Sequence, residues 1–436
     1  MKRRKFLQVA AAGAGAAALG PLVGCTPVAT SPTPLDVKGY LKEPARRIPV
    51  VDRADVVVLG GGPAGVAAAV SAAREGADVL LVERQYYLGG LWTGCCVLPV
   101  NNTDALLKDG SWRRVVRGFS EEICTRLTAM GMCIDIKEGS TPVPDPEAAK
   151  YVLERMLEES GVRLLYNCQG AGILRSGDRV DALILETKSG RVAVQAGLFV
   201  DASGDGDILE WAGEDFDIRR HQIGAMWRCG NAGALQRKGV LDTPVKGVKL
   251  FHTHGEMEQD GLDIYNLTRL QVKLRRQMWE TAEEDRRQPG CEDLFLLDST
   301  SLLGVRSTRV LRSLHNVTFD ESLRYTHYDD CIGIGGADPW FSYRDGTLPG
   351  RKRPAWQIPY RSLVPRKVPN LLVAGRCFGY DEQIVYDARE VATCFVTGQA
   401  AGVAAACAVL GRTDVRSLDI PHLRHRLQAQ GVNLGA

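Results

Sequence analysis

Several patterns that would assign a function directly are missing from this chain of 436 residues. Its 12 cysteines form no C-x-x-C pair and no zinc-type spacing. His252 and His254 have no further ligands nearby in the sequence, so no metal site is predicted. The formal net charge is +2, and −2 without the four cations of residues 2–5. Nucleic-acid binding needs a pronounced basic face, so we exclude a nucleic-acid partner.

Long hydrophobic runs are also scarce. The run over residues 6–24 is weakly apolar and is interrupted by Gly20-Pro21, so it is poorly suited to form a stable membrane span. Arg3-Arg4-Lys5-Phe6-Leu7 resembles a twin-arginine export signal, and Leu22-Val23-Gly24-Cys25 resembles a bacterial lipoprotein processing box. We expect a signal peptide over 1–24, lipidation at Cys25 and an exported, membrane-anchored lipoprotein on the periplasmic or cell-surface side. An uncleaved N-terminal anchor is the alternative.

The rest of the chain has the composition of a globular protein, with 45% hydrophobic and 24% charged residues. The polar stretch over 25–50 lacks periodicity and predicts a tether. We expect one α/β domain assembled from residues 51–212 and 367–436. Residues 213–366, where periodicity weakens, are expected to form an inserted α+β cap or substrate domain.

A strand, a glycine cluster, a helix and a second strand follow the tether in that order. Residues 55–59 are a short β-branched run, residues 63–74 an Ala-rich helix stopped by Gly76, and residues 77–83 a buried strand. Together they have the length of a parallel β-α-β crossover. A glycine cluster between a strand and a helix of such a unit is a more specific signal for nucleotide binding than a glycine cluster alone.

Those glycines read Gly60-x-Gly62-x-x-Gly65. Gly60 permits a tight turn, Gly62 admits a pyrophosphate and Gly65 lets the helix pack on the sheet. Glu83 follows at the end of the second strand, where an acid binds ribose hydroxyls and disfavours a 2′-phosphate. The pattern predicts a dinucleotide site, and the alternative is a glycine turn without a ligand.

Four later segments have clear secondary-structure signals. Asp145 is expected to cap a helix that has Pro146 at its first position. Residues 172–196 read as antiparallel strands with turns at 176–178 and 188–190. Residues 371–374 predict a buried strand, and residues 389–410 a long helix headed by Arg389.

These segments, in this order, resemble the FAD-dependent oxidoreductase family built on the glutathione-reductase-type flavoprotein fold. The similarity spans residues 54–410 and rests on the following segments: Gly60–Gly65, Glu83, Leu88-Gly89-Gly90, Val200–Asp207, Ile358-Pro359-Tyr360-Arg361, Asn370–Cys377 and Gly398–Gly402. The resemblance implies FAD as cofactor and a Rossmann-like FAD-binding domain of the GR2 type, built from discontinuous segments.

The same resemblance implies a set of cofactor-binding residues. Gly89 and Gly90 would line the approach to the flavin, Ala202–Gly204 would lie beside the adenosine half, and Gly375, Arg376 and the helix from Gly398 would close on the ribityl and isoalloxazine end. The full set is Gly60, Gly62, Pro63, Ala64, Gly65, Glu83, Arg84, Gly89, Gly90, Ala202, Gly204, Gly375, Arg376, Gly398, Ala401 and Gly402.

For two pairs of nearby residues the sequence leaves two possible roles open. Asp205 and Asp207 either contact the ligand or cap a short helix over residues 208–212. Cys95 and Cys96 follow the second glycine pair closely. They either have a redox or covalent-flavin role or are inert buried thiols.

The candidates for substrate handling are Arg306, Arg361, Tyr380 and Asp381. Arg306 belongs to a stretch that resembles the family's G-x-R-E-x-R, but Ser307 replaces the acid, which puts a proton-transfer role there in doubt. Arg306 and Arg361 could bind a carboxylate or stabilise developing negative charge, against the alternative of ordinary ion pairing. Tyr380 or Asp381 could serve as acid or base, against the alternative of a solvated loop.

We therefore expect a flavoenzyme that transfers a hydride between a small polar or anionic substrate and flavin N5. A quinone or another external acceptor would reoxidise it. The alternatives are a non-catalytic flavin- or nucleotide-binding lipoprotein and an electron-transfer partner of another exported enzyme.

Overall fold

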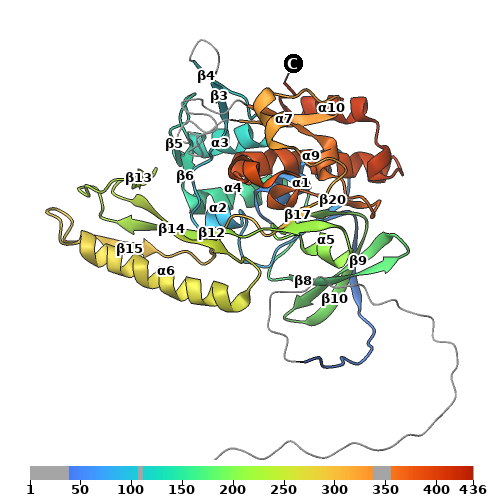
Figure 1. The fold of residues 1–436 in the computed structure, drawn as a ribbon, viewed down its shortest axis with the longest axis horizontal. Coiled ribbons are helices and arrows are strands. Elements are labelled where there is room, and N and C mark those ends of the chain that lie inside the picture. Colours follow the sequence, from blue (N-terminus) through green and yellow to red (C-terminus); the bar gives the residue numbers. More distant parts are fainter. Residues whose placement is uncertain (1–38, 107–110, 337–354, 436) are drawn as a thin grey trace, which may run out of the picture.

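The computed structural model describes residues 39–106, 111–336 and 355–435 (Figure 1). The predicted signal peptide and the predicted lipidation position Cys25 lie outside the described residues. The chain is of the mixed α/β class. A large sheet is covered by helices, and a smaller second sheet lies beside it.

The large sheet has the order β7-β2-β1-β10-β9-β8, with β20 also paired to β10. Its parallel strands are β7 (Arg163–Leu165), β2 (Val79–Val82), β1 (Val50–Leu59), β10 (Gly190–Asp201) and β20 (Leu371–Val373). The antiparallel strands β8 (Gln169–Ser176) and β9 (Arg179–Thr187) confirm the predicted turns at 176–178 and 188–190. Strand β20 joins the sheet from the other end of the sequence.

In its central part the sheet is buried on both faces, because residues 56–59, 79–82, 198–200 and 371–373 are apolar throughout. Val56 and Val58 of β1 face the larger core, whereas Val57 and Leu59 face the smaller one. This is the continuous hydrophobic pattern of a covered parallel sheet. The smaller core is closed by α5 (Asp207–Trp211) and by apolar residues of β8 and β9.

The larger core contains α1 (Pro63–Arg74), α3 (Phe119–Ala129), α4 (Pro146–Glu159) and α9 (Val391–Leu410). The predicted helix over 63–74 is confirmed. Asp145 caps α4 as predicted, because its Oδ1 accepts hydrogen bonds from the N–H groups of Glu147 and Ala148 at 3.0 Å. Helix α9 has the length and composition of a membrane span, but 83% of its apolar window is buried inside the fold, as expected for a core helix.

Three predicted boundaries are corrected. Strand β1 starts at Val50, inside the predicted tether, because its first residues pair with β10. The second strand is shorter than residues 77–83. Helix α9 starts at Val391 rather than Arg389, because Glu390 is an N-cap with extended backbone and Arg389 ends the short helix α8 (Val385–Ala388).

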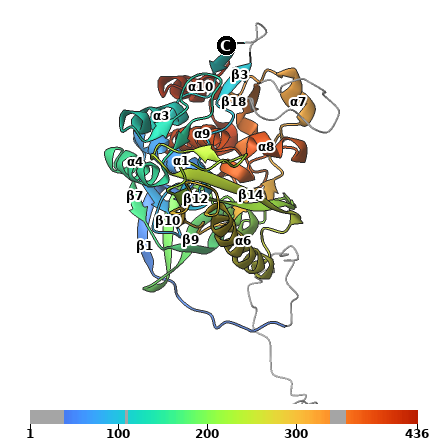
Figure 2. The ribbon, with the colours of Figure 1, turned by 90° about the vertical axis from the view of Figure 1, so that its left-hand side faces the viewer.

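The second sheet has the order β13-β14-β12-β15, with β16 paired to β12. Its strands are β12 (His221–Gly230), β13 (Leu241–Asp242), β14 (Lys249–Gln259), β15 (Phe295–Asp298) and β16 (Gly304–Val305). Helix α6 (Ile264–Asp285) packs on this sheet through Leu270, Leu274 and Met278, and forms a separate core with it. Figures 1 and 2 show α6 on the outer side of the second sheet, away from α1 and α9.

After the second sheet the chain returns to the larger core. Strand β17 (Arg309–Leu311) pairs with β11 (Phe216–Ile218), and β18 (Cys331–Gly335) pairs with β19 (Trp356–Pro359). Ile332, Trp356 and Ile358 belong to the same buried cluster as α9. The remaining elements are α2 (Leu91–Gly94), β3 (Asp104–Leu106), β4 (Trp112–Arg114), β5 (Cys133–Ile134), β6 (Val143–Pro144), α7 (Phe319–Arg324) and α10 (Ile420–Ala429).

Candidate functional site

A cavity of about 1390 Å³ runs from the glycine turn after β1 to the inner side of the second sheet. One end of it is lined by residues predicted to bind the cofactor. These are Gly60, Gly62, Pro63, Ala64, Glu83, Arg84, Gly90, Ala202, Gly204, Gly375 and Arg376. They come from four distant parts of the chain, which the parallel strands β1, β2, β10 and β20 bring to one edge of the large sheet.

The three glycines of the turn have the separate roles that their spacing predicts. Gly60 has φ of +104°, and a Cβ there would lie 2.4 Å from the carbonyl oxygen of Ala202. A Cβ on Gly65 would lie 1.7 Å from the carbonyl oxygen of Gly60. A Cβ on Gly62 would meet nothing within 4 Å. Gly60 and Gly65 are therefore required by the fold, whereas Gly62 keeps open a space in front of the α1 N-terminus.

That helix end is suited to a phosphate. Gly62 is the N-cap of α1 and provides no side-chain hydrogen bond, so the first N–H groups of the helix lack a capping side chain. Free N–H groups and the helix dipole together attract anions.

Glu83 is held in place at the edge of this space. Its Oε2 accepts a hydrogen bond from the N–H of Gly61 at 2.6 Å, and its Oε1 accepts one from the N–H of Gln85 at 2.7 Å. The side chain thus fixes the glycine turn and also lines the cavity. Each carboxylate oxygen keeps a second lone pair for a ribose hydroxyl.

Arg376 connects the cofactor end to the second sheet. Its Nη2 is 3.0 Å from Oδ1 of Asp205, and its Nη1 donates to the carbonyl oxygen of Val305 at 2.7 Å. A Cβ on Gly204 would lie 2.9 Å from the Arg376 Nη2. Gly204 and Arg376 are therefore neighbours, although the resemblance assigned them to opposite halves of the cofactor.

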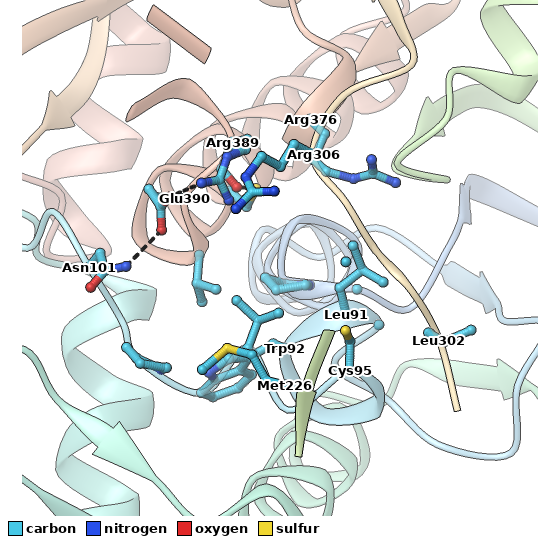
Figure 3. Close-up of a pocket in the computed structure, with 18 of the residues that line it drawn as sticks. Leu91, Trp92, Cys95, Asn101, Met226, Leu302, Arg306, Arg376, Arg389 and Glu390 are labelled. Carbon is cyan, nitrogen blue, oxygen red and sulfur yellow. Dashed lines mark hydrogen bonds and ion pairs between the residues drawn. The ribbon is translucent and has the colours of Figure 1, made fainter. Parts of the chain in front are cut away.

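The other end of the cavity is shown in Figure 3 and is called the arginine end here. It is lined by Leu91, Trp92, Cys95, Asn101, Met226, Leu302, Arg306, Arg389 and Glu390. In the view, Arg306 and Arg389 lie above, Trp92 and Met226 below, and Asn101 with Glu390 at one side. A cationic side of the cavity thus faces an apolar one.

The arginine end has a charge that the protein only partly neutralises. Nη1 of Arg306 donates to the carbonyl oxygen of Gln222 at 2.7 Å, and its buried Nε has no acceptor. Burial, and next the neighbouring Arg389, lower the pKa of Arg306 to about 10. Arg389 is paired with Glu390 at 3.0 Å, and its buried Nε also has no acceptor.

These observations can be compared with known proteins. A sequence profile described as FAD dependent oxidoreductase matches residues 55–227 and 227–427. The chain belongs to this family. The match covers both the large sheet and the second sheet, so FAD is the cofactor and the protein is an FAD-dependent oxidoreductase.

Individual relatives of this flavoenzyme match over a smaller part. A digeranylgeranylglycerophospholipid reductase of Methanosarcina mazei is 28% identical over 182 residues, which are 38% of this chain and 42% of the reductase. A thiamine thiazole synthase of Aeropyrum pernix is 58% identical over 189 residues, which are 40% of this chain and 64% of the synthase. The chain therefore covers less than two thirds of each of these relatives.

Among solved structures, a geranylgeranyl bacteriochlorophyll reductase-like protein from Thermoplasma acidophilum is similar at a TM-score of 0.45 and 14% identity. The similarity covers 88% of this chain and 84% of that one. The p-nitrophenol 4-monooxygenase PnpA from Pseudomonas putida has a TM-score of 0.46 and 11% identity, and the similarity covers 87% and 89% of the two chains.

The cofactor end fits FAD in the flavoenzyme. The open space at Gly62, the uncapped α1 N-terminus and the immobilised Glu83 suit the pyrophosphate and ribose groups of a dinucleotide. The remaining predicted cofactor residues do not line the cavity. Gly89 donates its N–H to the carbonyl oxygen of Gly61 at 2.8 Å and so supports the glycine turn.

Gly398 and Gly402 serve the packing of two helices. A Cβ on Gly398 would lie 2.1 Å from the carbonyl oxygen of Ala64, and one on Gly402 would lie 2.1 Å from that of Ala68. Both glycines therefore let α9 lie directly against α1, and Ala401 between them is fully buried. They therefore do not line the cofactor end, but they fix the position of α1, whose N-terminus does.

Of the four predicted substrate-handling residues, only Arg306 lines the cavity. Arg361 is half exposed and pairs with Asp330 at 3.0 Å. The Tyr380 hydroxyl donates to the carbonyl oxygen of Arg376 at 3.0 Å, and Asp381 accepts a hydrogen bond from the N–H of Phe319 at 3.2 Å. These three side chains hold loops together, because each binds a backbone group or an ion-pair partner and does not line the cavity.

The structure also bears on the two neighbouring pairs. Asp201, not Asp205 or Asp207, caps α5, since its Oδ2 accepts a hydrogen bond from the N–H of Leu209 at 2.9 Å. Cys95 lines the cavity, whereas the Cys96 thiol lies 3.8 Å from Oδ1 of Asp298. Burial raises the pKa of the Cys95 thiol, which disfavours the reactive thiolate.

Five residues of the arginine end were not predicted from the sequence: Arg389, Glu390, Asn101, Trp92 and Met226. Two of them could have been recognised in the sequence, because Arg389 and Glu390 are adjacent charged residues immediately before a long apolar helix. Among the residues that the structure describes, no cluster of three or more His, Cys, Asp or Glu could hold a metal ion.

Proposed function

We propose that the protein catalyses hydride transfer between a small polar or anionic substrate, bound at the arginine end, and FAD. Bound FAD supplies a hydride acceptor or donor at its N5 atom. An external acceptor of the quinone class would complete the turnover. The proposal refines the family assignment, which fixes the cofactor and the class of enzyme.

The continuity of the cavity carries this proposal. The same cavity that contains the glycine turn and Glu83 extends to Arg306 and Arg389. Its volume of about 1390 Å³ exceeds the roughly 300–1,000 Å³ that usually accommodates a single drug-sized ligand. The space therefore suits a cofactor together with a second molecule beside it.

The residues of the arginine end would position that second molecule. Arg306 and Arg389 present N–H donors to an anionic or polar group. Leu91, Trp92 and Met226 provide an apolar surface that excludes water from the reacting carbon.

Three further assignments are part of this proposal. We interpret the large sheet as a GR2-type FAD-binding domain, and the second sheet with α6 as the inserted substrate domain. The Arg3–Leu7 and Leu22–Cys25 motifs support export and a lipid anchor at Cys25. Metabolic labelling with palmitate, compared with a Cys25→Ser variant, tests the anchor. Label that persists in the variant would contradict it.

Spectroscopy of the purified protein tests the catalytic part. We expect the visible absorption band of bound flavin, and loss of that band when a suitable donor is added anaerobically. Quinone addition should restore the band. If dithionite reduces the flavin, but no donor substrate reduces it and no quinone reoxidises it, a non-catalytic binding protein is favoured. Absence of flavin would contradict the cofactor assignment.

A further inference from the structure

Two guanidinium groups lie side by side in the wall of one cavity. Arg306 follows β16 in the second sheet, whereas Arg389 lies between α8 and α9 beside the larger core. Figure 3 shows both side chains reaching into the same space from these separate elements. Like charges in a buried site repel each other, so this arrangement has a cost that a bound anion would offset.

The charge balance at this end leaves one positive charge without a partner. Glu390 pairs with Arg389 at 3.0 Å and also accepts a hydrogen bond from the Asn101 side chain at 3.1 Å. Among the described residues, Arg306 has no ion-pair partner, and its one hydrogen-bond acceptor is the neutral carbonyl oxygen of Gln222. A single negative charge would therefore neutralise the arginine end.

Three further basic groups lie near this end. The buried Arg219 donates to the carbonyl oxygen of Tyr380 and does not line the cavity. Arg376 is paired with Asp205 at 3.0 Å. His221 lies next to Glu382, with 3.7 Å between Nε2 and Oε1, and burial lowers the pKa of His221 despite that carboxylate. Its ring is therefore neutral near pH 7.

The side of the cavity opposite the arginines is apolar. Leu91, Trp92 and Met226 lie there, and the Trp92 indole N–H is already used by the carbonyl oxygen of Leu98 at 3.1 Å. Trp92 therefore offers only hydrocarbon contact to a ligand. A ligand that satisfies both sides needs an anionic group at one end and an apolar body at the other.

The geometry points to an amphipathic monocarboxylic acid as the substrate of this site. Its carboxylate lies between Arg306 and Arg389, and its apolar body lies on Leu91, Trp92 and Met226. Guanidinium groups match the planar carboxylate with paired N–H donors. Glu390 and Asn101 act as positioning residues, because they fix the Arg389 side chain. This inference rests on the proposed function, since it assigns the substrate class of that same cavity.

Ligand titration of the flavin-loaded enzyme tests the inference without knowledge of the reaction. Benzoate and hexanoate are added at constant ionic strength while the flavin spectrum and tryptophan fluorescence are recorded. Benzamide and hexanamide serve as neutral analogues of the same shape, and inorganic phosphate and sulfate as anions without an apolar body. We expect saturable changes with the two carboxylates, and binding at least about tenfold weaker for the amides and inorganic anions.

Variants then locate the binding site. Arg306→Met and Arg389→Met should each weaken benzoate binding about tenfold or more, with unchanged flavin content. Asn101→Ala should weaken it less, and Asn101→Asp should change its pH dependence, because a new acid would compete for Arg389. Arg287→Met, at an exposed position in the turn after α6, is the matched control and should bind benzoate normally.

Each contrary result overturns a different statement. If flavin is bound and no carboxylate perturbs the spectra, the substrate class is wrong while the proposed function stands. Tighter binding of phosphate or sulfate than of benzoate also contradicts the carboxylate. If Arg306→Met or Arg389→Met releases the flavin, the pair belongs to the cofactor rather than the substrate. Loss of flavin from the unmodified protein contradicts the proposed function itself.

Discussion

Gly398 of α9 lies directly against Ala64 of α1, so closely that a methyl group at residue 398 would be 2.1 Å from the Ala64 carbonyl oxygen. Ala64 also lines the cofactor end of the cavity. The contact therefore determines where the first turn of α1 lies relative to the bound FAD.

We predict that Gly398→Ala destabilises the protein and weakens FAD binding together. The overlap of the new methyl group with the α1 backbone should lower the free energy of unfolding by about 1–3 kcal/mol. The better helix propensity of alanine offsets roughly 1 kcal/mol of this loss. Urea unfolding and flavin content per protein measure the two effects. Unchanged values of both would show that α1 and α9 can separate without consequence.

Gly62→Ala should behave in the opposite way. Gly62 has φ of −70°, which alanine tolerates, and its Cβ would meet nothing within 4 Å. The flavin-free protein should keep its stability within about 0.5 kcal/mol. FAD affinity should fall about tenfold or more, because the methyl group would occupy the space in front of the helix end. Isothermal titration with FAD measures the affinity. An unchanged affinity would show that the pyrophosphate does not bind in front of Gly62.

Removal of the Arg306 charge should stabilise the protein. The pKa of Arg306 is lowered from 12.5 to about 10 in the folded state, so its charged form is disfavoured by folding at pH 7. Arg306→Met should raise the free energy of unfolding by about 1–2 kcal/mol, after the loss of the hydrogen bond to Gln222. The wild-type protein should gain stability as pH rises above 10, whereas the variant should not.

Urea unfolding at pH 7, with Arg287→Met as control, checks this prediction. A gain in stability that accompanies a loss of ligand binding is typical of a residue kept for function. If Arg306→Met is less stable than the wild type, another group of the protein already compensates the charge.

The carboxyl group of Asp207 should make stability depend on pH. Burial, and next the carboxylates of Asp205 and Asp201, raise the pKa of Asp207 from 3.8 to about 7. The folded protein then holds a proton that the unfolded chain has lost, so stability should fall as pH rises between these two values. The expected fall is on the order of 2–4 kcal/mol, because each pH unit between the two values contributes about 1.4 kcal/mol and the Asp207 side chain is partly exposed.

Asp207→Asn should remove most of this fall, whereas Asp178→Asn, at an exposed turn, should keep it. Thermal unfolding of the three proteins at a series of pH values makes the comparison. Equal slopes for the wild type and Asp207→Asn would assign the titration to another group.

Local sequence patterns were sufficient for elements whose signals lie within a few residues. The helix over 63–74, the Asp145 cap and the hairpin turns were predicted because propensity, spacing and capping act locally. Of the two interpretations kept open for Asp205 and Asp207, the capping one is wrong, because Asp201 takes that role. Asp201 reaches Leu209 only because the chain turns sharply after β10, which spacing alone does not show.

The arginine end was harder to predict because it is assembled from elements that are far apart in sequence. Arg306 was found from a motif, but its neighbour Arg389 was interpreted as the head of a helix. Arg361 is the last residue of a motif and Tyr380 follows another motif, yet neither lines the cavity. The Arg361 side chain pairs with Asp330, and the Tyr380 hydroxyl binds backbone. Adjacency along the chain indicates adjacency in space only within one element.

Strand β20 is added to the large sheet from the last fifth of the chain, beside β10. During synthesis the glycine turn leaves the ribosome early, but Gly375, Arg376 and α9 emerge only near the end. The cavity is therefore complete only after this segment has docked, and we expect FAD binding to require it. Flavin occupancy would thus report that β20 has docked, and a product truncated before β20 should remain colourless.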